Sequence, residues 1–272
     1  MSNLTSPTIV IRGAGDLATG VALRLHRAGF KKIVLLETDH PLAVRRTVAF
    51  SEAVYHGRMT VEGITAVFLG TAECVPDIWA TGDIPILSDP AAETLHIIRP
   101  EVLIDAIIAK RNLGTNMSQA PLVIGLGPGF VAGEDVHRIV ETKRGHHLGR
   151  VITAGSAEPN TGIPGNIDGY TIERVYWAEN QGMFSTSLNI GDMIAAGDTL
   201  GTVDNVPVIV NISGVVRGLL RNGTPVSKKT KLGDVDPRGI ISYCGEASDK
   251  ALSIGGGVLE AITAHMFSGE NA

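Results

Sequence analysis

The hydrophobic pattern at the start of the chain alternates between strand-like and helix-like spacing. Residues 8–12 (TIVIR) and 32–37 (KIVLLE) are apolar runs of strand length. Between them, from Asp16 to Ala28, apolar residues recur at three- and four-residue intervals, as on one face of a helix. Gly29 then stands where helices commonly end. The pattern therefore predicts a strand, a helix and a second strand, joined as a right-handed βαβ unit.

The same alternation continues to about residue 130. Further strands are predicted at 65–70, 84–88, 102–108 and 121–127, and further helices at 41–55, 71–81 and 91–98. Strands that alternate with helices are typical of a parallel, doubly wound sheet. Residues 1–130 are therefore expected to form a Rossmann-like nucleotide-binding domain in a protein of the α/β class.

The pattern changes after residue 130, where short β-like segments are separated by Gly, Asn, Asp and Pro. Residues 182–204 and 214–236 form an internal repeat with an offset of 32 positions and no gap. Seven of the 23 aligned pairs are identical: Gly182/Gly214, Leu188/Leu220, Gly191/Gly223, Leu200/Leu232, Gly201/Gly233, Val203/Val235 and Asp204/Asp236. Two such copies can form β-layers that bury each other's apolar faces. We expect a β-rich domain over 131–244 and a C-terminal helix within 245–272.

The repeat resembles the two halves of a biotinyl/lipoyl-type barrel-sandwich hybrid. The first half carries the pattern in Gly191–Leu200, and the second in Gly214–Val216 and Gly223–Val226. Carrier domains of this type hold their cofactor on a lysine in the hairpin between the halves, but residues 201–213 contain no lysine. The resemblance therefore implies a module without covalent biotin or lipoate, serving as a structural element or a binding face.

Composition narrows the classes of function. Hydrophobic residues make up 44% of the chain and aromatic residues only 4%, which suits a core of Val, Ile, Leu and Ala. The net charge of -5 gives no electrostatic basis for binding nucleic acid. No apolar run approaches the roughly 20 residues that span a bilayer. The first residues lack signal-peptide features, and Cys74 and Cys244 lie far apart, so we expect a cytoplasmic protein without disulfides.

The turn after the first predicted strand carries a dinucleotide-binding motif. The pattern G-x-G-x-x-G/A is matched by Gly13, Ala14, Gly15, Asp16, Leu17 and Ala18. In this motif Gly13 permits a sharp turn, Gly15 lets a pyrophosphate approach the backbone, and Ala18 lets the helix pack closely on the sheet. Glu37 ends the second strand, where an acidic residue binds a ribose hydroxyl. Asp16 is expected to cap the helix, in competition with an anionic ligand.

The motif leaves the ligand open. NAD(P), S-adenosylmethionine and a molybdopterin-type nucleotide are all candidates, because each offers a ribose or a phosphate to such a turn. A turn that serves only helix–sheet packing is the alternative. A second glycine loop, Gly125–Phe130, follows a predicted strand, which makes Gly127 and Gly129 candidate anion-binding residues. A loop without a ligand is an equally consistent interpretation of this second segment.

Three other groups of residues carry potential chemistry, and each also has a structural interpretation. His146 is a weak candidate for acid–base catalysis, although the segment KRGHH favours a surface loop. Cys244 is a weak candidate for handling sulfur or selenium as a thiolate, although free cysteines are most often buried. The segment with Asp234, Asp236 and Arg238 could bind a cation through its carboxylates, but it offers few oxygen ligands, so an Asp–Arg pair that stabilises a turn is the favoured interpretation. No metal site is predicted.

Five stretches of the sequence resemble a known family over nearly the whole chain. The chain resembles the YqeB-type accessory proteins of the selenium-dependent molybdenum hydroxylase system. Its first stretch also resembles the Rossmann part of XdhC-type maturation factors for xanthine dehydrogenase. The stretches that carry the resemblance are IRGAGDLATGVALRLHRAGF, PLAVRRTVAFSEAV, GLGPGFVAGEDVHRIVETKRGHHLGRV, TGIPG and LGDVDPRG.

The resemblance implies a role in a bacterial cytosol. It implies a factor that helps to mature a molybdenum hydroxylase, with the hydroxylase or other maturation proteins as partners, and it assigns no catalytic residue. The residues themselves leave two alternatives: an NAD(P)-dependent oxidoreductase of a small metabolite, and a non-enzymatic scaffold. They also leave open whether the protein catalyses a reaction and whether it forms homo-oligomers.

Overall fold

The computed structural model describes residues 6–268, which divide into two units. Of these residues, the first unit holds 6–41, 49–160 and 247–268, and the second unit holds 42–48 and 161–246. The sequence places the end of the first domain at residue 130. In the structure the chain stays in the first unit for thirty more residues, because two additional strands extend its sheet, and the C-terminal helix belongs to the same unit.

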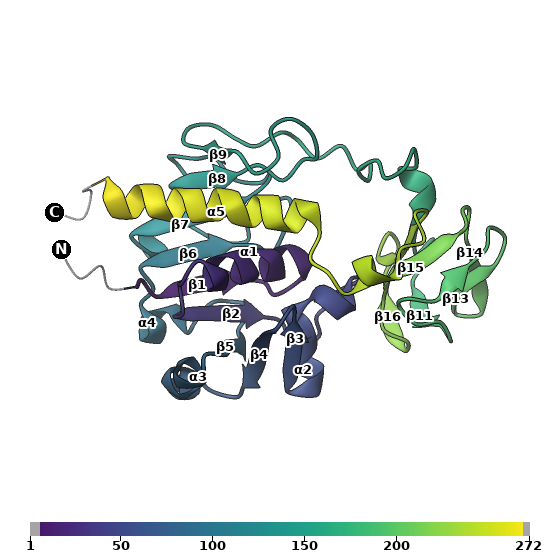
Figure 1. Cartoon of the computed structure of the whole chain (residues 1–272), viewed down its shortest axis with the longest axis horizontal. Coiled ribbons are helices and arrows are strands. Elements are labelled where there is room, and N and C mark those ends of the chain that lie inside the picture. The colour runs from purple at the N-terminus through teal and green to yellow at the C-terminus, as the bar shows by residue number, and fades with distance from the viewer. Residues whose placement is uncertain (1–5, 269–272) are drawn as a thin grey trace. The chain divides into compact units, whose positions relative to one another are not determined.

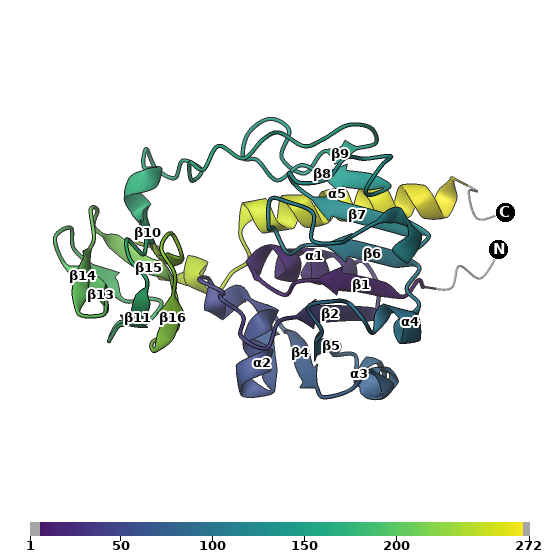
Figure 2. The ribbon, with the colours of Figure 1, turned by 180° about the vertical axis from the view of Figure 1, so that it is seen from behind.

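The first unit is built on a mixed nine-stranded sheet in the order β3-β4-β5-β2-β1-β6-β7-β8-β9, seen from both sides in Figures 1 and 2. Neighbouring strands from β4 to β8 are parallel, and the edge strands β3 and β9 are antiparallel. The strands are β1 (Ile9–Arg12), β2 (Ile33–Glu37), β3 (Arg58–Val61), β4 (Ile64–Leu69), β5 (Ile84–Ser88), β6 (Val102–Asp105), β7 (Leu122–Leu126), β8 (Arg138–Val140) and β9 (Val151–Ile152). The six strands predicted before residue 130 are confirmed, whereas β3 was not predicted.

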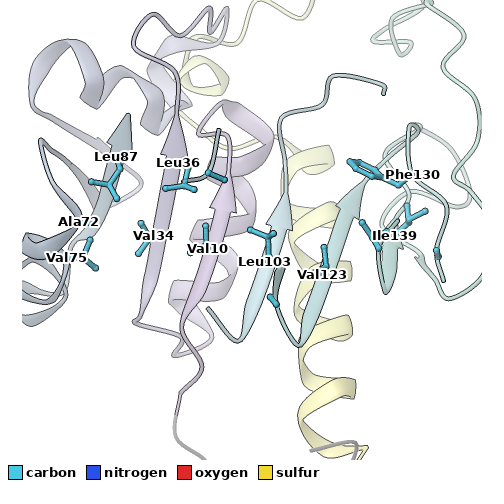
Figure 3. Close-up of a cluster of buried hydrophobic side chains, with 14 of the residues drawn as sticks. Val10, Val34, Leu36, Ala72, Val75, Leu87, Leu103, Val123, Phe130 and Ile139 are labelled. Atoms are coloured by element: carbon cyan, nitrogen blue, oxygen red, sulfur yellow. The ribbon is translucent and has the colours of Figure 1, made fainter. Parts of the chain in front are cut away.

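Helices cover both faces of this sheet. They are α1 (Asp16–Arg27), α2 (Ala53–His56), α3 (Val75–Thr81), α4 (Leu95–Ile98) and α5 (Asp249–Phe267). Side chains alternate between the two faces of each strand. Figure 3 shows the face of Val10, Val34, Leu36, Leu103 and Val123, against which the partly buried side chains of α3 and α4 pack. Within residues 6–268 no helix has both the length and the apolar character needed to cross a membrane.

The helices α1 and α5 pack side by side in unusually close contact (Figure 1). A Cβ atom placed on Gly20 would lie 2.5 Å from the Cβ of Ala251, and one on Gly255 would lie 2.9 Å from the Cβ of Arg24. Glycines in the middle of a helix cost stability. Here they are required because the two helix backbones approach each other through them.

The helix predicted over 41–55 is wrong. This segment forms two short 3₁₀ turns, Arg46–Val48 and Phe50–Glu52, followed by α2. In its second part, backbone amides bond to the start of α1 instead of forming helical bonds: the Phe50 amide donates to Thr19 Oγ1 and the Ser51 amide to the Ala14 carbonyl. The buried residues Val48, Ala49 and Phe50 are consecutive and not helically spaced, so tertiary contacts decide the local conformation.

The second unit contains two four-stranded antiparallel sheets, β10-β17-β15-β12 and β14-β13-β11-β16. The two copies of the sequence repeat exchange a strand. Strand β11 of the first copy pairs with β13 of its own copy and with β16 of the second, and strand β15 of the second copy pairs with β17 of its own copy and with β12 of the first. The strands are β10 (Val175–Trp177), β11 (Gly182–Ser185), β12 (Met193–Ile194), β13 (Thr199–Val203), β14 (Val206–Ile209), β15 (Gly214–Leu219), β16 (Thr224–Val226) and β17 (Lys231–Asp236).

The backbone contacts of the two copies match at the offset of 32 residues. Met183 faces Pro225 in one sheet, and their counterparts Val215 and Met193 face each other in the other sheet. Similarly, the Gly223 amide donates to the Phe184 carbonyl over 2.8 Å, and the Gly191 amide donates to the Val216 carbonyl over 2.9 Å. The buried side chains of both copies form one shared core. The repeat therefore folds as a pair of interlocked, equivalent halves.

Candidate functional site: the glycine turn after the first strand

The glycine turn lies at the carboxyl end of β1, between β2 and β6. The chain proceeds from β1 to β2 on one side and reaches β6 and β7 on the other, so β1 and β6 flank a topological switch point. In open parallel sheets, ligands bind in the crevice outside the carboxyl ends of the strands at such a point. The structure thus puts Gly13–Ala18 where a ligand of an open α/β sheet is expected.

Gly13 is required by the protein itself. Its φ angle is +96°, which L-residues rarely adopt. A Cβ atom at this position would lie 2.9 Å from the carbonyl oxygen of Ala106, in the loop after β6. The Gly13 amide also donates to the Leu36 carbonyl over 2.6 Å. Gly13 therefore provides the sharp turn that the sequence motif assigns to it.

At position 15, by contrast, nothing in the protein itself requires a glycine. Its φ angle is -66°, an ordinary value, and apart from its chain neighbours and its own helix backbone no atom lies within 4 Å of the position where its Cβ would be. Gly15 occupies the N-cap position of α1, where it supplies no capping side chain. The space above the turn is open at this residue, and the first amides of α1 face no capping group from it.

The remaining motif residues divide between packing and exposure. Ala18 is buried, at 1% exposed, which agrees with the close helix–sheet packing expected there. Leu17 and Asp16 are partly exposed. The prediction that Asp16 caps the helix is wrong, because Gly15 is the N-cap residue and the described hydrogen bonds of residues 6–268 include none that caps α1 from a side chain.

Glu37 contacts the turn directly. Its Oε2 accepts a hydrogen bond from the Ala14 amide over 2.9 Å, and its Oε1 accepts one from the Thr38 amide over 2.8 Å. The carboxylate is therefore fixed at the mouth of the turn, where the motif places the ribose-binding acid. One amide of the turn, that of Ala14, is already bonded to this carboxylate, so a ligand has the amides from Gly15 onward.

The second glycine loop has structural reasons for its glycines. The Gly127 amide donates to the Val140 carbonyl over 2.9 Å, so it is not free for an anion. A Cβ on Gly127 would clash with the Thr142 side chain, and one on Gly129 would lie 2.6 Å from the Arg111 backbone nitrogen. Both residues have positive φ angles, +75° and +116°. The geometry thus favours the second interpretation, turn formation and close packing, over an anion-binding role for Gly127 and Gly129.

A buried polar cluster beneath the switch point was not predicted. Arg12 Nη1 donates to Thr115 Oγ1 over 2.6 Å, and this hydroxyl donates to Asp105 Oδ2, also over 2.6 Å. Arg12 Nη2 further bonds the Pro90 carbonyl over 3.1 Å. Because Asp105 turns its carboxylate into this cluster and accepts from the Ile107 amide, β6 ends at Asp105 and not at residue 108. The sequence signal was a charged residue at the end of each of two apolar strands.

The basic segment at 143–147 is a surface loop, as the structural interpretation predicts. His146 and His147 are exposed, with ring centroids 5.1 Å apart in an edge-to-face arrangement. Lys143 pairs with Glu158, and Arg144 forms two hydrogen bonds of 2.7 and 2.8 Å to Asp249 at the start of α5. No described group positions His146 for proton transfer. Among residues 6–268 no cluster of three or more His, Cys, Asp or Glu side chains could hold a metal ion.

Cys244 does not have the environment of a reactive thiolate. It is buried, and burial raises the pKa of its thiol above the ordinary value. We expect iodoacetamide at pH 8 to label the exposed Cys74 and to leave Cys244 unmodified in the folded protein, because the thiolate is the reactive form. Peptide mass spectrometry after brief labelling measures this. Both cysteines should react in urea, and rapid native labelling of Cys244 would contradict the assignment.

The carboxylates of GDVDPRG belong to a buried ionic network in the second unit. Arg238 donates to Asp236 through its backbone amide and through Nε, at 3.1 and 2.9 Å, which confirms the predicted turn-locking pair. Asp236 and Asp234 also bind Arg217, and Asp234 binds Arg174. Burial alone would raise both pKa values. Instead, Lys231, Arg217 and Arg174 hold the pKa of Asp234 at about 2, and Arg238 and Arg217 hold that of Asp236 below its ordinary value.

Comparisons with known proteins give one close sequence relative. No family model matches the chain. The chain is 47% identical over 264 residues, 97% of its length, to the uncharacterized protein YqeB of Escherichia coli strain K12. It covers 49% of that protein, so it spans about half the length of the relative.

Among solved structures, the product-bound ectoine utilization protein EutE (DoeB) from Ruegeria pomeroyi aligns at 10% identity with a TM-score of 0.24, covering 84% of this chain and 56% of that one. A succinylglutamate desuccinylase from Silicibacter sp. aligns at 12% identity with a TM-score of 0.25, covering 86% and 85%. These low scores support no conclusion about fold or reaction. The informative comparison is therefore in sequence: over nearly all of its length, the chain is similar to about half of YqeB.

Proposed function

We propose that the first unit is a Rossmann-like domain that binds a nucleotide, of the adenosyl or pterin type, at the turn Gly13–Ala18. The observation that carries this proposal is the open space at Gly15. Neither backbone conformation nor packing requires a glycine there. A pyrophosphate that approaches the backbone does require one. The carboxylate of Glu37, held against the Ala14 amide, is placed to accept a ribose hydroxyl.

We further propose that the protein is a cytoplasmic accessory factor in the maturation of a molybdenum hydroxylase, with or without selenium. This part rests on the family resemblance of the sequence. In this proposal the second unit is a barrel-sandwich-hybrid-like module that presents a binding face to a partner protein. The exchanged strands of its two halves support the assignment of the module. The segment 201–213 between the halves contains no lysine for a covalent cofactor.

The proposal predicts a measurable nucleotide affinity. Mass spectrometry of molecules released from gently purified protein identifies what is bound. Calorimetric titration then compares NAD⁺, NADP⁺, S-adenosylmethionine and a molybdopterin dinucleotide. We expect Glu37→Gln to lower the affinity for the ligand that binds best by roughly tenfold or more, since a hydrogen bond to a charged group contributes about 1.5–3 kcal/mol. The exposed Glu134 provides the control variant Glu134→Gln, which should bind as the unmodified protein does.

The outcomes separate the candidate functions. A bound molybdopterin species supports cofactor handling during maturation. NAD(P) with turnover of a small metabolite supports the oxidoreductase. If no molecule is released and no nucleotide binds, the nucleotide-binding proposal is wrong and the scaffold interpretation replaces it.

A further inference from the structure

The loop after β6, residues 106–111, borders the glycine turn across the switch point. The Ala106 amide donates to the Arg12 carbonyl over 2.9 Å. The position of a Cβ on Gly13 lies only 2.9 Å from the Ala106 oxygen and 3.2 Å from the Ile107 nitrogen. The two segments are thus in backbone contact at the point where a ligand of an open α/β sheet binds.

This loop is held in an unusual conformation. Ile108 and Lys110 have φ angles of +61° and +60°, in the left-handed region that a β-branched residue such as isoleucine rarely enters. At one end the Ile107 amide is bonded to Asp105 Oδ1. At the other end the backbone of Arg111 packs against Gly129, at a distance that leaves no room for a side chain there. Contacts at both ends of the loop therefore fix its backbone conformation.

Two carboxylates at the turn act against the binding of an anionic ligand. Asp16 lies in the first turn of α1, and Glu37 contacts the turn, so two carboxylates oppose the partial positive charge of the helix N-terminus. Arg12 does not compensate them, because it is buried and forms an ion pair with Asp105. A positive charge from another segment would thus favour the binding of a phosphate at this turn.

The loop carries two such charges. Lys110 and Arg111 are adjacent and exposed. Neither has an ion-pair partner within the part of the chain that the structure describes. Exposed cations without carboxylate partners are available to a phosphate, which lysine binds as a point charge and arginine through two parallel hydrogen bonds.

We propose that Lys110 and Arg111 bind the phosphate groups of the nucleotide, opposite the amides of the first turn of α1. The site thereby selects a ligand with a terminal or bridging phosphate over a nucleoside or an adenosyl compound without one. This inference rests on the proposed nucleotide-binding function and specifies its ligand class: a nucleoside diphosphate or a dinucleotide. S-adenosylmethionine, which has no phosphate, is disfavoured.

The test compares phosphorylated and unphosphorylated probes on the full chain. Calorimetry measures the affinities of ADP, GDP and CDP and of adenosine, guanosine and cytidine for the unmodified protein and for Lys110→Gln/Arg111→Gln. We expect the double variant to lose roughly tenfold or more in affinity for the diphosphate that binds best, with the affinity for its nucleoside unchanged within about twofold. The dependence of diphosphate affinity on salt concentration should also decrease.

Two controls accompany the measurement. Lys32→Gln removes the charge of an exposed lysine next to the amino end of β2, whereas the glycine turn follows the carboxyl end of β1, and it should leave diphosphate binding unchanged. Lys110→Arg/Arg111→Lys keeps both charges and should retain more affinity for the diphosphate than the glutamine variant does. It shows whether substitution at these two positions perturbs the site when both charges are kept.

The inference is overturned if the double glutamine variant binds the diphosphate as well as the unmodified protein does, or if diphosphate and nucleoside lose affinity equally. In the first case the protein still binds a nucleotide, but without a phosphate contact from Lys110 and Arg111. If the unmodified protein binds neither these probes nor the nucleotides tested under the proposed function, both the nucleotide-binding function and the phosphate contact of Lys110 and Arg111 are wrong.

Discussion

The variant Asp234→Asn is expected to lower the free energy of unfolding of the second unit by about 3–5 kcal/mol, the usual cost of removing one partner from a buried ion pair. Asp234 is 2% exposed. It accepts hydrogen bonds from Arg174 Nη1 over 2.9 Å and from Arg217 Nη2 over 3.1 Å. Neutralising Asp234 leaves Asp236 as the remaining buried carboxylate of a network that holds two buried arginines, Arg174 and Arg217. Urea unfolding, monitored by the fluorescence of Trp177 in a protein that also carries Trp79→Phe, measures the effect.

A matched substitution separates the network from a general effect of charge removal. Asp168 belongs to the same unit and is exposed, and its φ angle of +50° suits asparagine equally well. Asp168→Asn should change the unfolding free energy by less than about 0.5 kcal/mol. Equal midpoints for the Asp234 and Asp168 variants would show that the buried network does not stabilise the unit.

The same network predicts how stability depends on pH. The pKa of Asp234 is about 2 in the folded protein and lies near the ordinary 3.8 in the unfolded chain. A depressed folded-state pKa stabilises the protein fully above pH 4, and this contribution is lost as the pH falls from about 4 to about 2. The lowered pKa of Asp236 acts in the same direction. Urea midpoints between pH 5 and pH 2.5 should therefore fall by an amount equivalent to about 2 kcal/mol for Asp234, and less steeply in Asp234→Asn.

Local pattern was sufficient for the parts of the fold whose burial follows a simple period. Strands β1 and β2 are buried along nearly all of their length, and the large apolar residues of α1 recur at helical spacing, so residues 9–37 could be predicted from spacing. The repeat at 182–236 was also visible, because each copy buries equivalent positions. The exchange of β12 and β16 between the two sheets could not be deduced from the sequence, since it concerns pairing between copies and not the pattern within one.

Tertiary contacts decide the parts that sequence did not predict. The segment 49–56 bonds its backbone to Ala14 and Thr19, thirty-odd residues earlier, so its apolar residues do not indicate a helix face. The end of β6 depends on Asp105 meeting Arg12 and Thr115 in the folded chain. The same holds for the candidate site: the motif identified Gly13 and Glu37, whereas the loop with Lys110 was read as the end of a strand and the start of an unassigned segment.

Introducing serine at Gly13 or at Gly15 should have opposite consequences, which tests whether the turn is structural or functional. Gly13→Ser places a side chain at a φ angle of +96° and 2.9 Å from the Ala106 oxygen, so we expect a loss of about 2–4 kcal/mol in stability. Gly15→Ser meets no protein atom and puts a good capping residue at the start of α1, so stability should stay equal or rise by up to about 1 kcal/mol.

Nucleotide affinity distinguishes the two roles of Gly15. If its missing side chain exists for a ligand, Gly15→Ser fills the space above the turn and uses the helix amides for its own hydroxyl, and the affinity for a diphosphate nucleotide should fall by roughly tenfold or more. Thermal unfolding and calorimetry on the same samples measure both quantities. A Gly15→Ser protein that is destabilised as strongly as Gly13→Ser would indicate that the glycine serves the fold. Unchanged nucleotide binding in a stable Gly15→Ser protein would place the ligand somewhere other than this turn, because a phosphate bound to these amides cannot share them with a capping hydroxyl.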